Sequence, residues 1–140
     1  MPLSVDEVKA GDSREQVVVE DLKRTQIVQY AGASGDFNPL HTDQEFAVKV
    51  AGYPGVFAHG MLTMGMTGRV LTDWLGRENL LRFGVRFKAQ VWPGDTLTVT
   101  ATVDAVTRDD AGPLAEISLR TVNQHGAEVV TGTAAARLAE

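Results

Sequence analysis

Two side chains that can exchange protons, the carboxyl of Asp36 and the imidazole of His41, lie five positions apart in the segment YAGASGDFNPLH. Asn38 and Pro39 stand between them. Pro39 has no amide hydrogen and disfavours helical geometry at Asn38, and Gly35 can take backbone angles that other residues avoid. We therefore predict a stiff loop after a helix that directs both side chains into one cavity, as general acid–base chemistry requires.

The same residues also allow a simpler interpretation. Gly, Asp, Asn and Pro are all favoured in turns, so Asp36 could merely cap a backbone amide and His41 could be a surface histidine. The order and spacing favour the first interpretation. The segment resembles the signature of the R-specific enoyl-CoA hydratases, or MaoC-like dehydratases: an aromatic residue, small residues, Gly-Asp-x-Asn-Pro-hydrophobic-His, five residues and a small residue, here Ala47.

A second segment, Phe57 to Leu62, resembles the part of that family that enters the long central helix. The resemblance implies that the backbone amide of Gly60 binds the thioester carbonyl oxygen. Amides at a helix N-terminus lack intrahelical partners and carry partial positive charge, so they would stabilise an enolate-like transition state. Alternatively, Gly60 only permits tight packing. For His59 we favour a structural role, because the role in the family belongs to the neighbouring backbone.

A third segment, from Val85 to Asp95, resembles the strand and turn that follow this helix, so the resemblance extends over about residues 30–98. It implies an α+β hot-dog fold, in which a curved antiparallel sheet wraps around one long central helix. The residue patterns agree with this order. They predict a strand over 16–20, a helix over 22–33 with Asp21 as its N-cap, a short helix over 43–50 and the long helix over 59–75. After Asn79 they predict antiparallel strands with turns at 109–113 and 124–126.

The long helix carries no charged residue between Gly60 and Gly68, and its apolar positions run almost all the way round, which predicts a buried helix. Its glycines each cost about 1 kcal/mol relative to alanine, and close contact with the wrapping sheet would explain them. Met61 and the two methionines that follow it could form a flexible acyl-binding surface, but methionines on a buried helix usually fill the core.

Composition excludes several classes of protein. The chain has 140 residues, which predicts a single domain over 1–140, with 44% apolar and 22% charged residues. A net charge of −5 argues against a nucleic-acid-binding protein. The absence of cysteine excludes disulfides and a cysteine nucleophile. No secretion signal or membrane-length apolar run is visible, so we expect a cytoplasmic protein without membrane insertion.

The resemblance implies an enzyme that reversibly hydrates trans-2-enoyl thioesters to R-3-hydroxyacyl thioesters in fatty-acid or related acyl metabolism. Asp36 and His41 would hold one water, and the residues do not decide which of them activates it. Asn38 would orient the water or the carboxylate, and Ser34 would hydrogen-bond Asp36. Neither a cofactor nor a metal is expected, since the three histidines lack the spacing of metal ligands.

The substrate carrier would be coenzyme A or acyl carrier protein. Candidate substrate-binding residues are Ser34, Tyr53, Phe57, Met61 and Arg86, of which Arg86 could contact phosphate or simply solubilise the surface. Edge strands left by a single wrapped sheet need covering, so we expect a homodimer or a dimer of dimers, with a heterodimer as the alternative. A hot-dog thioesterase and a subunit of a heteromeric dehydratase remain competing functions.

Overall fold

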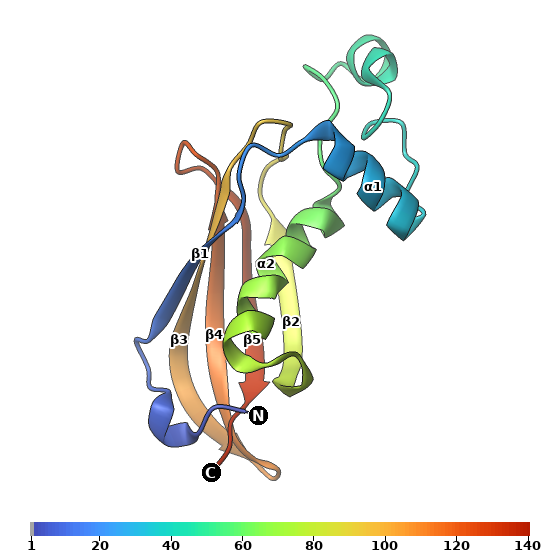
Figure 1. Cartoon of the computed structure of the whole chain (residues 1–140). Coiled ribbons are helices and arrows are strands. Elements are labelled where there is room, and N and C mark those ends of the chain that lie inside the picture. The colour runs from blue at the N-terminus through green and yellow to red at the C-terminus, as the bar shows by residue number, and fades with distance from the viewer. Residues whose placement is uncertain (1) are drawn as a thin grey trace.

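A curved antiparallel sheet forms most of the molecule in a computed structural model that describes residues 2–140 (Figure 1). Its strands are β1 (Ser13–Val19), β2 (Leu80–Phe87), β3 (Leu97–Asp109), β4 (Gly112–Val122) and β5 (Glu128–Arg137). They lie in the order β1-β3-β4-β5-β2, so β1 and β2 form the two edges. The turn residues predicted between β3, β4 and β5 do connect these three neighbouring strands.

The inner face of the sheet follows the two-residue period of the sequence. On β3, Leu97, Val99, Ala101 and Val103 are at most 1% exposed, and the threonines between them are half-buried. Ile117 and its neighbours on β4 continue the same core. Alternation of this kind places one face of a strand against the core.

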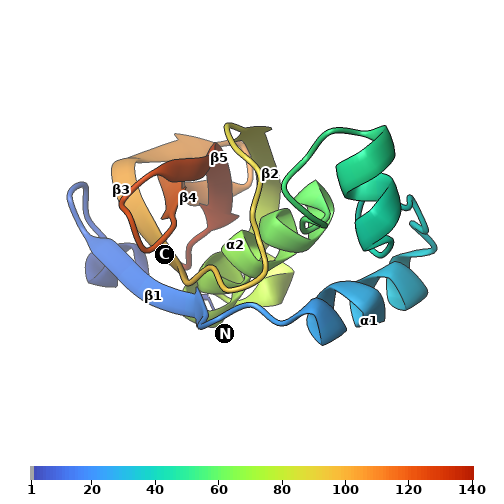
Figure 2. The same cartoon turned by 90° about the horizontal axis from the view of Figure 1, so that it is seen from above.

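The long helix α2 (Gly60–Leu75) packs against this inner face, as both views show (Figures 1 and 2). It begins after His59 and ends at Gly76, whose φ of 88° lies in a region that favours glycine. The helix starts one residue later than predicted and ends at Leu75 as predicted, and the hot-dog arrangement of one central helix and a curved sheet is confirmed.

The prediction that α2 is buried all round was wrong. One side of the helix packs on the sheet, whereas Met61 on the other side is 56% exposed. A Cβ added at Gly68 would lie 2.9 Å from the ring of Phe83, so contact with the sheet explains this glycine. A Cβ added at Gly65 would meet no neighbouring atom within 4 Å, so packing within this chain does not explain why this residue is a glycine.

The N-terminal elements differ from prediction at their boundaries. Strand β1 begins earlier than predicted, because polar Ser13 pairs with Thr102 of β3 and pairing needs no apolar side chain. Helix α1 (Arg24–Ser34) begins later, after Lys23. Asp21, the predicted N-cap, has a left-handed φ of 49° and forms an ion pair with Lys23 instead.

Short helical elements complete the chain. They are η1 (Val5–Glu7), the π-helical η2 (Phe46–Val50) and η3 (Arg77–Asn79). Asp43 accepts a hydrogen bond from the Phe46 amide at 3.1 Å, and helical geometry begins at Gln44, one residue after the predicted start. Helix α1 and the segment 35–59 project together beyond one end of the sheet, next to the start of α2 (Figures 1 and 2).

Candidate active site

The loop after α1 is stiffened by its own side chains. Gly35, with a φ of 78°, ends the helix. The Ser34 hydroxyl then accepts a hydrogen bond from the Asp36 amide at 3.2 Å, and the Asp36 carboxylate accepts one from the Asn38 amide at 3.2 Å. The Asn38 side-chain oxygen in turn accepts one from the Leu40 amide at 3.0 Å. Each side chain therefore caps the backbone two residues further on, which is a succession of Asx-type turns.

His41 is oriented by a backbone carbonyl. Its Nδ1 lies 2.7 Å from the Phe57 carbonyl oxygen. Since a carbonyl only accepts, Nδ1 carries the hydrogen and donates it, which leaves Nε2 of the neutral ring as an acceptor. This Nε2 lies 4.0 Å from Asp36 Oδ2. That distance is too long for a direct hydrogen bond, so the two acceptors can share one water or substrate oxygen.

His59 lies directly behind this pair. It is 1% exposed, and its Nε2 donates a hydrogen bond to the main-chain oxygen of Asp36 at 3.0 Å. Its ring stacks on that of His41 with centroids 3.8 Å apart and 25° between planes. The edge of Tyr30 contacts its other side, with centroids 4.8 Å apart. The three histidines are far apart in the sequence, but tertiary folding brings His41 and His59 together.

Asp36, His41 and His59 have candidate ligand atoms within 4.8 Å of one another, which raises the question of a metal ion. One nitrogen of each imidazole already donates a hydrogen bond to a main-chain carbonyl oxygen. The other nitrogens lie in two nearly parallel stacked rings, so their lone pairs do not converge on one point, as a tetrahedral site requires. The arrangement therefore suits proton transfer better than metal binding.

The N-terminus of α2 supplies a hydrogen-bond donor beside the pair. Gly60 is the first residue of the helix, and the amides of Leu62 and Thr63 are the ones that fold back onto the His59 carbonyl. The Gly60 amide precedes this first turn and can therefore donate to a bound oxyanion. An added Cβ at Gly60 would lie 3.2 Å from the Phe87 ring, so the backbone here is closely approached.

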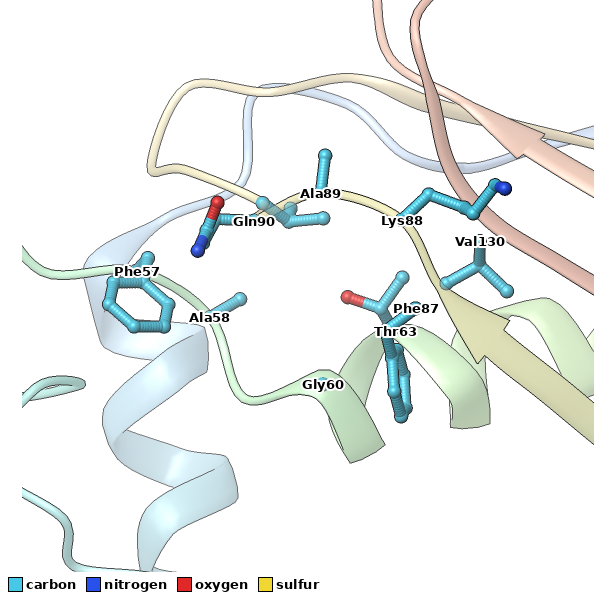
Figure 3. A pocket seen from close by; sticks show the side chains of 10 residues that line it. Phe57, Ala58, Gly60, Thr63, Phe87, Lys88, Ala89, Gln90 and Val130 are labelled. Carbon is cyan, nitrogen blue, oxygen red and sulfur yellow. The ribbon is translucent and has the colours of Figure 1, made fainter.

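A cavity of about 280 Å³ opens next to Gly60. Figure 3 shows it between Phe57, Ala58, Gly60 and Thr63 on one side and Lys88, Ala89 and Gln90 on the other. Its lining combines apolar side chains with the hydroxyl of Thr63 and the amide of Gln90, and Lys88 stands at its edge. Such a mixture suits an acyl chain attached to a polar or charged carrier.

The predicted substrate-binding residues fall into two groups. Phe57 lines the cavity and contacts the His41 ring edge-on, with centroids 5.3 Å apart, and Tyr53 packs on Phe57 at 4.9 Å. Met61 is exposed beside Gly60. Arg86, in contrast, borders a separate groove along β2 and β5 and does not line the cavity near Gly60.

Thr63 and Gln90 line the cavity but were not predicted as site residues. A signal existed for Thr63, since it lies three residues after Gly60 on the same helix face. Lys88 lies at the cavity rim. Gln90 belongs to an irregular segment after β2, where no period predicts the direction of a side chain.

Comparison with known proteins agrees with this geometry. The family profile described as the MaoC-like domain matches residues 6–124. The chain belongs to the MaoC-like domain family. A relative named (R)-specific enoyl-CoA hydratase, from Aeromonas caviae, is 34% identical over 115 residues, which cover 81% of this chain and 84% of that protein.

A second relative and a solved structure extend the comparison. Enoyl-CoA hydratase ChsH3 of Mycobacterium tuberculosis is 40% identical over 97 residues, or 61% of this chain, but this match spans only 34% of that protein. The solved structure described as the (R)-hydratase from A. caviae involved in PHA biosynthesis superposes with a TM-score of 0.82 at 29% identity, over 96% of this chain and 99% of that one. Within residues 2–140, no helix is both long and apolar enough to cross a membrane.

Proposed function

We propose that this chain catalyses the reversible hydration of a trans-2-enoyl thioester to the R-3-hydroxyacyl thioester, in fatty-acid or related acyl metabolism. One observation carries the proposal: two proton acceptors, His41 Nε2 and Asp36 Oδ2, lie 4.0 Å apart, and the His41 ring stacks on His59, the residue directly before the first amide of α2. The R configuration rests on likeness to the A. caviae hydratase, because the side chains alone do not specify it.

In the proposed mechanism, one water donates a hydrogen bond to each acceptor, which leaves a lone pair on its oxygen directed at the β-carbon. As the C–O bond forms, the π electrons of the double bond move towards the thioester oxygen, and the Gly60 amide stabilises the resulting enolate. One member of the pair takes the proton of the water, and a proton passes from the pair to the α-carbon. Dehydration follows the same steps in reverse.

The cavity beside Gly60 is the proposed site of the acyl group, with its carrier at the rim. Lys88, at this rim, carries a positive charge on a chain whose net charge is −5, so it suits the phosphates of coenzyme A or of acyl carrier protein. Comparing hydration rates for the same acyl group on coenzyme A and on acyl carrier protein shows which carrier the enzyme uses. No cofactor enters the proposed steps. We place this activity in a single domain over residues 1–140, in the cytoplasm.

We also propose a homodimer, or a dimer of dimers. Strand β2 is an edge of the sheet, and exposed apolar side chains gather near the site: Phe37 is 68% exposed and Phe87 50%. Surfaces of this kind are usually covered in solution. Light scattering of the pure chain measures the assembly. A monomer that gains activity only with a second protein would support a heterodimer instead.

The decisive experiment follows the absorbance of the conjugated enoyl thioester when the pure chain meets a short trans-2-enoyl-CoA. Asp36→Asn keeps the oxygen that accepts from the Asn38 amide but removes the proton acceptor, so we expect a rate loss of about 10²–10⁴-fold. The matched control is Asp43→Asn, whose side chain also caps a backbone amide, and we expect it to keep wild-type activity.

The outcomes separate the competing functions. Loss of absorbance with formation of an R-3-hydroxyacyl product supports the hydratase. Release of free thiol from a saturated acyl thioester would support a thioesterase on the same fold. Equal rates for wild type and Asp36→Asn would rule out the proposed mechanism.

A further inference from the structure

His59 is the most enclosed polar side chain of the site and contacts both members of the proposed catalytic pair. It donates to the main-chain oxygen of Asp36 at 3.0 Å and stacks on His41 with centroids 3.8 Å apart. It is 1% exposed, and Tyr30 closes its remaining side. His59 itself does not line the cavity beside Gly60.

The hydrogen-bonding of His59 is incomplete. Because the Asp36 carbonyl accepts from Nε2, the neutral ring has its lone pair on Nδ1. Within residues 2–140, this Nδ1 is buried without a hydrogen-bond partner. An unsatisfied buried acceptor destabilises the folded state, because it loses its hydrogen bond to water and gains none from the protein. An apolar side chain of similar size would fill the same space without this cost, so packing alone does not account for an imidazole here.

We propose that His59 is a positioning residue for the hydration reaction. Its Nε2–H holds the backbone at Asp36, and its flat ring sets the plane of the His41 imidazole, so that Oδ2 and Nε2 remain 4.0 Å apart on either side of the water. Histidine combines a hydrogen-bond donor and a flat ring in one side chain, and it therefore leaves Nδ1 unpaired here. This inference rests on the proposed function, since the water belongs to that reaction.

Three substitutions separate the two contacts. His59→Gln keeps a donor near the position of Nε2 but loses the ring, His59→Phe keeps a ring but loses the donor, and His59→Leu loses both. Misplacement of reacting groups by about 1 Å can cost about 10²-fold in rate. We therefore expect kcat of His59→Leu to fall by about 10²-fold with KM little changed, and the other two variants to be intermediate.

The control is His125→Gln, at an exposed histidine in the turn after β4, which should behave as wild type. Thermal midpoints are recorded for every variant, so that rates are compared per folded molecule. If His59→Leu keeps the wild-type kcat, or if all three variants lose kcat equally and only in proportion to their loss of folded protein, His59 is a structural residue and the proposal is overturned.

A second measurement does not depend on turnover. Ring ¹⁵N chemical shifts report which nitrogen of a neutral histidine carries the hydrogen, and single substitutions assign the three histidines. We expect hydrogen on Nε2 of His59 and on Nδ1 of His41, and we expect the His41 signals to move in His59→Leu but not in His125→Gln. Hydrogen on Nδ1 of His59, or an unmoved His41, would falsify the positioning role. An inactive wild type with these tautomers would instead count against the proposed reaction.

Discussion

The sheet and the site-bearing segment 34–59 are held in shape by different forces. The inner face of the sheet is apolar and nearly inaccessible, with Val99 and Ala101 at 0% exposure. The loop over residues 35–39 is exposed, and its shape comes from side chains such as Asp36 and Asn38 that cap nearby backbone amides. The sheet therefore depends on burial, and the loop on local polar contacts.

This difference predicts a division of effects. Burial of apolar area is the main source of folding free energy, so changes in the sheet should lower stability and leave the chemistry of each folded molecule intact. Exposed polar groups contribute little to stability. Changes in the site should therefore alter the rate far more than they alter unfolding.

The largest expected effect comes from His41→Asn. The asparagine amide can replace Nδ1 as donor to the Phe57 carbonyl, but no atom replaces the acceptor Nε2. We expect kcat/KM to fall by about 10²–10⁴-fold, with about 1 kcal/mol of unfolding free energy lost with the stacked ring. Initial rates and urea unfolding measure the two quantities, with His125→Asn as control. A larger change in stability than in rate would contradict the division of effects.

Val103→Ala tests the sheet. Val103 is 1% exposed on β3, and removing its methyl groups should cost about 2 kcal/mol of unfolding free energy. Val17→Ala on edge strand β1, where the side chain is 47% exposed, should change stability by less than about 0.5 kcal/mol. Urea unfolding compares the two. If Val103→Ala lowers kcat per folded molecule, the sheet and the site are coupled more closely than we propose.

Gly60→Ala lies at the junction of the two regions. Its new methyl group would approach the Phe87 ring to 3.2 Å and displace the first amide of α2. We expect about a tenfold loss of kcat, less than for complete removal of an oxyanion donor. Gly65→Ala has open space around its Cβ and should keep its rate while gaining about 1 kcal/mol of helix stability. Equal rates for both variants would argue against oxyanion binding at Gly60.

The smallest effect is expected at the end of the sheet where β3 turns into β4. There, hydrogen bonds from the Arg137 guanidinium at 2.8 and 2.9 Å lower the pKa of Asp109 to about 2. A lowered pKa gives stability that is present above the ordinary aspartate pKa of about 4 and is lost as pH falls through the folded value. Because the pair is exposed, the contribution is small.

We therefore expect the urea midpoint of wild type to fall more than that of Asp109→Asn between about pH 4 and about pH 2. Asp110→Asn, in the same turn, serves as the control and should follow wild type. Parallel curves for wild type and Asp109→Asn would show that this ion pair does not contribute to stability.

The sequence predicted the features that depend on neighbouring residues. Helix α2 and strands β3 to β5 follow from periodicity and turn chemistry, and the loop from Gly35 to His41 follows from residue types that restrict the backbone over a few positions. The start of α1 was misplaced, because Asp21 pairs with Lys23 and leaves the N-cap position.

Features that depend on distant contacts could not be predicted. His59 reaches the main-chain oxygen of a residue 23 positions away and stacks on His41, and no local pattern indicates either contact. The open side of α2 and the separation of Arg86 from the cavity likewise depend on how far the sheet wraps around the helix. Where tertiary packing decides the position of a side chain, the residue types near it in the sequence do not predict that position.

The contact between His59 and residue 36 has a consequence for how such a protein can diverge. The bond is made to a main-chain oxygen, which every amino acid supplies. A duplicated gene that exchanges Asp36 for asparagine therefore keeps this anchor and also keeps a side-chain oxygen that can accept from the Asn38 amide. Loss of the reaction and loss of the fold are separate events in such a lineage, so an inactive descendant can persist as a folded protein and acquire another role.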